Sequence, residues 1–160
     1  MNNNYFNEYY DDYRNNYYNS NYSMYASSLK DFGPLPFVFN IEKLTNLNNN
    51  FRVALWTGSH LQITLMCIPA GESIGLEIHP DTDQFIIVEQ GRALVQMGSN
   101  QNSLNFQREI GDNFAVVVPA GTWHNIINIG CTPLKVYSIY ASPKHPKGTI
   151  QNTKSDATYE

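Results

Sequence analysis

The sequence has little charge, little cysteine and no long apolar run, and each shortage argues against a class of protein. Only 15% of the 160 residues are charged, and the formal net charge is −4. A protein that binds nucleic acid generally needs a clustered basic surface, and the basic residues here are scattered along the chain. No apolar run approaches the roughly 20 residues that a membrane-spanning helix requires. We therefore expect neither a nucleic-acid partner nor a membrane partner.

The two cysteines are too few for a disulfide framework, so Cys67 and Cys131 are predicted to be buried free thiols. The first residues, Met-Asn-Asn-Asn-Tyr-Phe-Asn-Glu, have neither a basic start nor an apolar stretch, and they predict no secretory signal. The expected compartment is therefore the cytoplasm.

The N-terminal region is low in aliphatic residues, because residues 1–25 contain eight Asn and eight Tyr. Such a segment cannot bury enough apolar surface to offset the entropy of ordering it, so residues 1–32 are predicted to be a disordered, low-complexity tail. Polar tracts with interspersed aromatic residues are also adhesive. The tail is therefore either a solubilising segment or an anchor into a higher assembly. Its composition resembles that of bacterial spore-coat proteins, which makes a spore coat or spore surface the alternative location.

Residues 33–146 are predicted to form one all-β domain, because short strand-like runs alternate with turn residues throughout. The runs are Phe37 to Asn40, Phe51 to Trp56, Leu61 to Ile68, Ile74 to His79, Gln84 to Glu89, Arg92 to Met97, Asn105 to Ile110, Phe114 to Val118, Trp123 to Asn128 and Leu134 to Tyr140. Only Ile41 to Leu47 has a helical pattern. Regularly spaced short strands are typical of a closed barrel or sandwich. Residues 147–160 are predicted to be a polar, loosely held C-terminal tail.

Four side chains of metal-ligand type stand out: Glu77, His79, Gln84 and His124. Residues two apart on a strand point to one face, so Glu77 and His79 would project together. The turn residues 80–83 would bring Gln84 opposite His79 on the next strand. One carboxylate, two imidazoles and one amide oxygen suit a divalent transition metal. A hydrogen-bonded cluster without metal is the alternative.

The spacing of these residues resembles the first motif of the cupin superfamily. That motif is Gly, five residues, His-x-His, three or four residues, Glu, six residues and Gly. Here Gly71 is followed at the same spacing by Glu77-Ile-His79, Gln84 and Gly91. Glu77 therefore stands where the family has its first His, and Gln84 where it has Glu.

The second cupin motif, Pro-x-Gly-x-x-His-x-x-x-Asn, is matched completely by Pro119, Gly121, His124 and Asn128. The glycine that precedes it in the family is represented by Gly111, two residues further upstream than usual. The resemblance covers roughly residues 36–142. It implies a cupin double-stranded β-helix, a jelly-roll barrel, with Glu77, His79, Gln84 and His124 as metal ligands. The metal could be Mn, Fe, Zn, Ni or Cu.

Positions beside these four residues suggest the shape of the site. Ile86 and Val88 share a strand face with Gln84 and would form an apolar cup around it. Gln62 and Tyr140 would line the mouth of the barrel if their strands have the expected register. His145, between Ser-Pro-Lys and Pro, is predicted to lie in an exposed loop.

The globular part resembles small bacterial cupins of the mannose-6-phosphate-isomerase-like type. The likeness runs from 51–58 through 119–124 to 137–140. It implies a metal-dependent isomerase that acts on a small polar metabolite, a sugar or a sugar phosphate, and it implies a homodimer. The catalytic residues beyond the metal centre are unknown. Candidate phosphate ligands are chosen only by residue type: Arg52, Arg92, Arg108 and Lys135.

Two other functions stay open. One is a non-haem metal oxygenase in which His79, His124 and Glu77 hold iron. The other is a non-enzymatic coat protein that uses the barrel as a scaffold and the tyrosine-rich tail for assembly, because a fold alone does not choose among functions.

Overall fold

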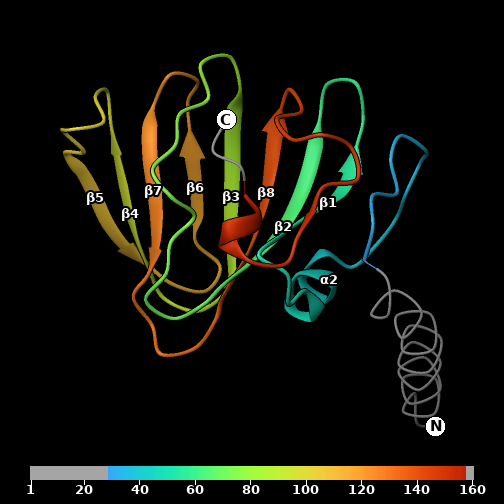
Figure 1. Ribbon diagram of the computed structural model, residues 1–160, viewed down its shortest axis with the longest axis horizontal. Helices are drawn as coiled ribbons and strands as arrows, with labels where there is room; N and C mark the ends of the chain where they lie inside the picture. Colours follow the sequence, from blue (N-terminus) through green and yellow to red (C-terminus); the bar gives the residue numbers. More distant parts are fainter. Residues whose placement is uncertain (1–28, 158–160) are drawn as a thin grey trace, which may run out of the picture.

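The protein folds into two antiparallel sheets that share one core, as the computed structural model of residues 29–157 shows (Figure 1). The six-stranded sheet has the order β6-β3-β8-β2-β1-β9, and the three-stranded sheet has the order β5-β4-β7. The strands are β1 (Arg52–Thr57), β2 (Gln62–Ile68), β3 (Asp83–Gln90), β4 (Ala93–Gly98), β5 (Phe106–Ile110), β6 (Ala115–Val118), β7 (Trp123–Asn128), β8 (Leu134–Ala141) and β9 (Ile150–Gln151). The predicted all-β fold is confirmed.

The inward face of the large sheet is polar at one end and apolar at the other. Gln62 on β2 pairs with Tyr140 on β8, and Tyr140 pairs in turn with Gln84 on β3, so the three form one row across the sheet. All three are buried. Further along the same strands the inward positions are apolar and pack against Val95 and Ile126 of the small sheet; they include Met66, Ile68, Ile86, Val88, Leu134 and Val136. The barrel therefore has a solid apolar end and a polar end that can hold a site.

A second core covers the outer face of β1 and β2. Helix α2 (Ile41–Leu47) begins at Asn40, whose side chain accepts a hydrogen bond from the backbone of Lys43. Its Leu44 packs with Leu55 and Leu65 in this second core. The predicted helical segment is therefore confirmed.

The segment before α2 differs from the prediction in two ways. No strand forms at residues 37–40, although the sequence there has a strand-like pattern. Leu29 and Phe32, which the sequence assigned to the tail, pack against the second core, and the Phe32 backbone N–H donates to the Leu55 carbonyl. The prediction for residues 1–28 lies outside the described residues.

The segment after β8 is held against the barrel rather than loosely attached. Strand β9 pairs with β1, with Gln151 opposite Arg52 and Ile150 opposite Val53. A short 3₁₀ helix, η1 (Lys154–Asp156), follows it. The prediction of a loose tail is therefore wrong for residues 147–157, because hydrogen bonds to a distant strand offset the low apolar content of the segment.

Two further sequence predictions concern the burial of the cysteines and the presence of a membrane-spanning helix. Cys67 is buried as predicted, whereas Cys131 is exposed, so the prediction is wrong for the second thiol. Within these residues no helix is long and apolar enough to cross a membrane.

Candidate metal centre

Glu77 is positioned by backbone pairing with β7, not by a strand of its own. Its N–H donates to the His124 carbonyl at 3.0 Å, and the His124 N–H donates to the Glu77 carbonyl at 2.9 Å. The predicted strand from Ile74 to His79 is wrong, because only isolated bridges form at Ser73 and Glu77. Gly75, at a φ of 101°, interrupts the extended run between them. The segment still brings Glu77 and His124 side by side.

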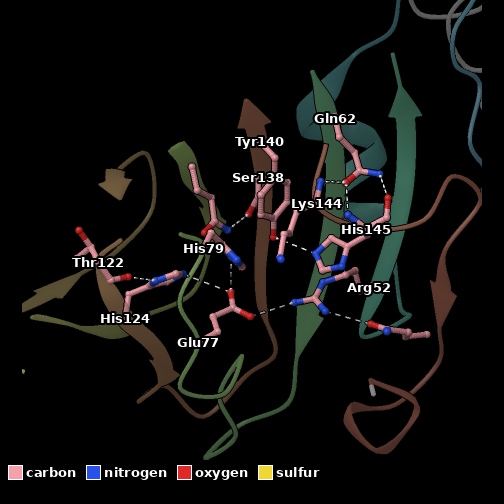
Figure 2. A network of polar contacts seen from close by, with 12 residues as sticks. Arg52, Gln62, Glu77, His79, Thr122, His124, Ser138, Tyr140, Lys144 and His145 are labelled. Carbon is pink, nitrogen blue, oxygen red and sulfur yellow. Dashed lines mark hydrogen bonds and ion pairs between the residues drawn. The ribbon is translucent and has the colours of Figure 1, made fainter. Parts of the chain in front are cut away.

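The carboxylate of Glu77 lies between two imidazoles (Figure 2). Its Oε1 is 3.4 Å from His79 Nε2 and 3.3 Å from His124 Nε2. One ligand atom from each of the three residues lies within 4.8 Å of the others. The two rings are buried, with exposures of 4% and 1%, and the carboxylate is partly exposed. The structure therefore brings together three of the four predicted ligands.

The tautomer of His124 follows from its second ring nitrogen. Nδ1 lies 2.9 Å from the Thr122 carbonyl oxygen, which can only accept, so Nδ1 carries the proton. In the neutral ring that metal binding requires, Nε2, the atom that faces Glu77, then keeps its lone pair. Such a backbone contact is the usual way of orienting a ligating imidazole.

Several buried polar atoms at this point have no hydrogen-bond partner. They are Glu77 Oε1, both ring nitrogens of His79, His124 Nε2 and Gln84 Oε1. Buried polar groups are normally paired, and leaving one unpaired costs roughly 1–3 kcal/mol. A carboxylate oxygen and two imidazole lone pairs that converge in this way fit a divalent transition metal, which accepts from all three.

Glu77 is ionised at the pH of a cell. Its burial disfavours the charged form, but the neighbouring imidazoles of His124 and His79 and the guanidinium of Arg52 outweigh burial and hold the pKa of Glu77 far below its usual range. Arg52 Nη2 lies 4.0 Å from Glu77 Oε2. The site therefore presents one full negative charge to a cation.

Gln84 lies on β3 and is buried, as the motif spacing predicts. Its Nε2 donates to Ser138 Oγ at 3.3 Å, which orients the amide and leaves Oε1 without a partner. An amide oxygen held in this way is a neutral donor of the kind that a metal accepts. Gln84 as a fourth ligand stays a prediction.

His145 and Tyr140 join the site, although the sequence predicted His145 to lie in an exposed loop. Gln62 holds the loop that contains Lys144 and His145 against the barrel. Its Oε1 accepts from the backbone N–H groups of both residues, and its Nε2 donates to the His145 carbonyl. His145 Nε2 then lies 3.3 Å from the Tyr140 hydroxyl. Tyr140 in turn packs edge-on against His79, with ring centroids 5.6 Å apart. Nothing in the local sequence signals this placement, since Gln62 is 83 residues away.

Burial sets the charge of both residues. It lowers the pKa of His145 to about 3, with the nearby Arg52 charge acting in the same direction, so this imidazole is neutral near pH 7. Burial also raises the pKa of Tyr140 to about 12, and Tyr140 therefore keeps its proton. Both are uncharged hydrogen-bonding groups beside a candidate metal ligand.

A cavity of about 470 Å³ opens beside Glu77 and His79. Its walls are the 74–79 segment, Trp123, Arg52 and parts of the C-terminal segment, namely residues 144–146, 149–151 and 156–157. Of the four basic candidates from the sequence, only Arg52 lies there. Arg92 is exposed and pairs with Glu109, Arg108 is exposed, and Lys135 donates to Asn48 and Asn49. The C-terminal segment, which the sequence treated as a tail, thus forms one side of the cavity.

Comparison with known proteins decides the family. Residues 64–140 match the Cupin domain family. The uncharacterized protein YrkC of Bacillus subtilis is 63% identical over 129 residues, which are 81% of this chain and 69% of YrkC. The chain belongs to the cupin family. An uncharacterized protein of Acanthamoeba polyphaga mimivirus is 39% identical to this cupin over 115 residues, 71% of this chain and 70% of the viral protein.

The crystal structure of BH2720 from Bacillus halodurans is similar to this cupin, with 61% sequence identity and a TM-score of 0.79. The alignment covers 79% of this chain and 96% of that one. Cupins typically bind metals, and the Glu77, His79 and His124 cluster is a possible site for one in this cupin.

Proposed function

We propose that this cupin is a metal-dependent enzyme that acts on a small polar metabolite, with isomerase chemistry on a sugar or sugar phosphate. The observation that carries the proposal is the convergence of Glu77, His79 and His124, whose facing atoms are buried and unpaired beside a cavity. A purely structural cluster would be expected to satisfy these atoms within the protein. The cavity volume lies within the range of small-ligand sites, roughly 300–1,000 Å³.

Glu77, His79 and His124 would hold the metal, with Gln84 as a neutral fourth donor. A bound divalent metal would supply Lewis-acid polarisation of a substrate carbonyl or hydroxyl oxygen. Two imidazole nitrogens and one carboxylate can bind Mn, Fe, Zn, Ni or Cu, so the ligand set does not determine the identity of the metal. The ionised carboxylate gives affinity for a cation without prior loss of a proton.

Other side chains of the chain would orient the substrate. Tyr140 keeps its hydroxyl proton and His145 is neutral near pH 7, so each can form hydrogen bonds without adding charge. The Trp123 side of the cavity offers an apolar surface.

One observation favours a second candidate function. Two imidazoles and one carboxylate form the ligand set of non-haem iron oxygenases, and here Glu77, His79 and His124 supply it. Oxygen uptake by iron-reconstituted protein in the presence of sugars would support an oxygenase. Isomerisation without oxygen uptake would support the first proposal.

Metal analysis of the purified full chain tests the proposal. We expect close to one divalent metal per chain after reconstitution, and at least a tenfold loss of affinity in Glu77→Ala and in His124→Ala, because each removes one of three ligands. His60→Ala is the matched control, since His60 lies on the exposed β1–β2 hairpin. Wild-type protein that binds no metal after reconstitution would rule out both enzyme proposals.

Partners and location stay proposals as well. We expect a homodimer, which light scattering of the full chain would detect as twice the chain mass. If the tyrosine-rich segment anchors the protein in an assembly such as a spore coat, deletion of residues 1–25 abolishes assembly and leaves metal binding intact. If the protein is a cytoplasmic enzyme, the deletion changes neither.

A further inference from the structure

We infer that the cavity contains an anion subsite, in which Arg52 and Lys144 bind the carboxylate or phosphate group of the substrate. The inference rests on the proposed function and narrows its substrate class to an oxyanion-bearing small molecule. The inference would be wrong if the substrate were an uncharged sugar.

Arg52 is a buried guanidinium with hydrogen-bonding capacity to spare. It is 4% exposed and lines the cavity from β1. Its Nη1 donates to Gln151 Oε1 at 3.1 Å, and its Nη2 is 4.0 Å from Glu77 Oε2. Its Nε is buried and has no partner. A planar fork with an unused N–H suits a carboxylate or phosphate, because both accept two parallel hydrogen bonds.

Lys144 adds a second positive charge to the same cavity. Gln62 fixes the backbone of Lys144 by accepting its N–H at 3.1 Å. Among residues 29–157 no carboxylate lies within ion-pair distance of the Lys144 amine. Figure 2 shows Lys144, His145 and Arg52 on the same side of Glu77. Two cations from distant parts of the chain therefore line the same cavity.

The charge balance of the cavity favours an anion. Its carboxylates are Glu77 and Asp156, and its cations are Arg52 and Lys144, so the protein groups sum to zero. His145 is neutral near pH 7 and does not change this sum. A divalent metal on Glu77 would leave the cavity with a net charge of +2, in a chain of net charge −4. A bound oxyanion would reduce that excess and satisfy the free Arg52 N–H.

The position of Arg52 also limits the shape of the substrate. Glu77 directs Oε1 toward the imidazoles and Oε2 toward Arg52. Its carboxylate therefore lies between the two imidazoles on one side and the guanidinium on the other. One small molecule can therefore place its oxyanion on Arg52 and a hydroxyl or carbonyl oxygen near the metal ligands. Sugar acids and sugar phosphates both have this arrangement.

Three six-carbon probes test the subsite: glucose, gluconate and glucose 6-phosphate. Each is titrated into the full chain, metal-free and with Mn²⁺, at constant ionic strength, and binding is followed by calorimetry or by amide NMR shifts. We expect at least one anion to bind about tenfold or more tightly than glucose, as charge-assisted hydrogen bonds imply. A preference for gluconate indicates a carboxylate substrate, and a preference for glucose 6-phosphate indicates a phosphate.

Matched variants assign the effect to the subsite. Arg52→Gln and Lys144→Gln are each expected to weaken binding of the preferred anion about tenfold, with little change for glucose. Arg92→Gln and Lys147→Gln remove the same charge outside the cavity and are expected to leave binding unchanged. Lys144 lies on a loop, so its variant keeps the test valid if Arg52→Gln fails to fold.

The outcomes separate this inference from the proposed function. If Mn²⁺ binds but neither anion binds better than glucose, the subsite is wrong and the metal centre stands. The subsite is also wrong if the two control variants weaken anion binding as much as the cavity variants do. If Mn²⁺ does not bind but the anions still depend on Arg52, the proposed enzyme fails and the anion site remains.

Discussion

Glu77 and Gln84 are the residues at which this cupin departs from the usual ligand pattern of its family. The carboxylate stands at the position of an imidazole, and an amide stands at the position of the carboxylate. The charge of the ligand set is therefore unchanged, but it is moved from strand β3 to the 74–79 segment. There it lies between two imidazoles and within 4.0 Å of Arg52. The exchange places the carboxylate of the candidate metal centre beside the cavity wall.

Substitution Gln84→Glu would place a second carboxylate at the usual family position. We expect metal affinity to rise at least tenfold, about 1.4 kcal/mol, because a second negative charge faces the cation. The metal-free variant should be less stable, since the new carboxylate is buried near Glu77. Competition with a chelating dye measures the affinity. An affinity equal to that of wild type would show that Gln84 does not contact the metal.

His145 makes the folded protein sensitive to mild acid. Its folded pKa of about 3 lies below the roughly 6.5 of an unfolded histidine, so the unfolded chain binds more protons between these values. Stability therefore falls as the pH drops below about 6.5. We expect this histidine to account for about 2 kcal/mol of loss between pH 7 and pH 5.

Urea unfolding of wild type and His145→Gln at both pH values, in EDTA, measures that contribution. The variant should lose less stability than wild type on going from pH 7 to pH 5. Any constant cost of the substitution, such as a weaker contact with Tyr140, cancels in this difference. Equal losses in the two proteins would contradict the prediction.

At the scale of elements, three separate segments are joined through one side chain, Asp31. Its carboxylate accepts from the N–H of Gly33, from the N–H and hydroxyl of Thr57 at the end of β1, and from the N–H of Gly148 before β9. Burial disfavours its charge, but these hydrogen bonds outweigh burial and lower the pKa of Asp31. The cavity wall formed by residues 144–157 is thus linked to the segment that precedes α2.

Substitution Asp31→Asn should destabilise the protein by about 1–2 kcal/mol, because the amide can replace only some of the hydrogen bonds and carries no charge. The lowered pKa means that the stabilisation is present above about pH 4 and is lost as the pH falls further, so the two proteins converge in acid. Chemical unfolding at pH 7 and pH 3 measures both. Asp81→Asn, at an exposed turn, is the control.

The 74–79 segment stays beside β7 through a few backbone hydrogen bonds, although it forms no continuous strand. Ile74, Leu76 and Ile78 alternate with other residues as a strand would, yet only one isolated bridge forms within the segment, at Glu77. Their positions relative to β7 are sufficient to orient Glu77. A candidate ligand can therefore be supplied by an irregular segment that is hydrogen-bonded to a regular strand.

At the scale of the whole molecule, the apolar core and the candidate site occupy opposite ends of the barrel. The apolar end is filled by side chains of both sheets, while the polar end contains Gln62, Tyr140, Gln84 and the ligands. The polar end leaves several buried atoms unpaired, which lowers the stability of the metal-free protein. Metal binding should recover part of that stability.

Thermal unfolding with and without metal tests this coupling. A free metal concentration of 100 times the dissociation constant should stabilise the folded state by about 2.7 kcal/mol, provided that the unfolded chain does not bind it. For a domain of this size we expect the melting temperature to rise by several degrees. At the same metal concentration Glu77→Ala should gain no more than about 1.4 kcal/mol, because its affinity is expected to be at least tenfold lower. An equal rise in that variant would show that the metal acts elsewhere.

The sequence by itself determined the all-β fold, eight of the nine strands in the described residues and the identity of the residues at the candidate metal centre. These follow from patterns that are local or nearly so: alternation along a strand, glycine at turns, and two motifs of fixed spacing. The structure brings three of the four predicted ligands together and leaves Gln84 buried on the predicted strand.

Only the tertiary structure decided what surrounds that centre. Gln62 reaches a loop 83 residues away, and Arg52 reaches Gln151 across 99 residues. Such contacts depend on how sheets and termini pack, and no local pattern records them. This is why His145 resembled an exposed loop residue, residues 147–157 resembled a tail, and the cations of the cavity could not be chosen from the sequence.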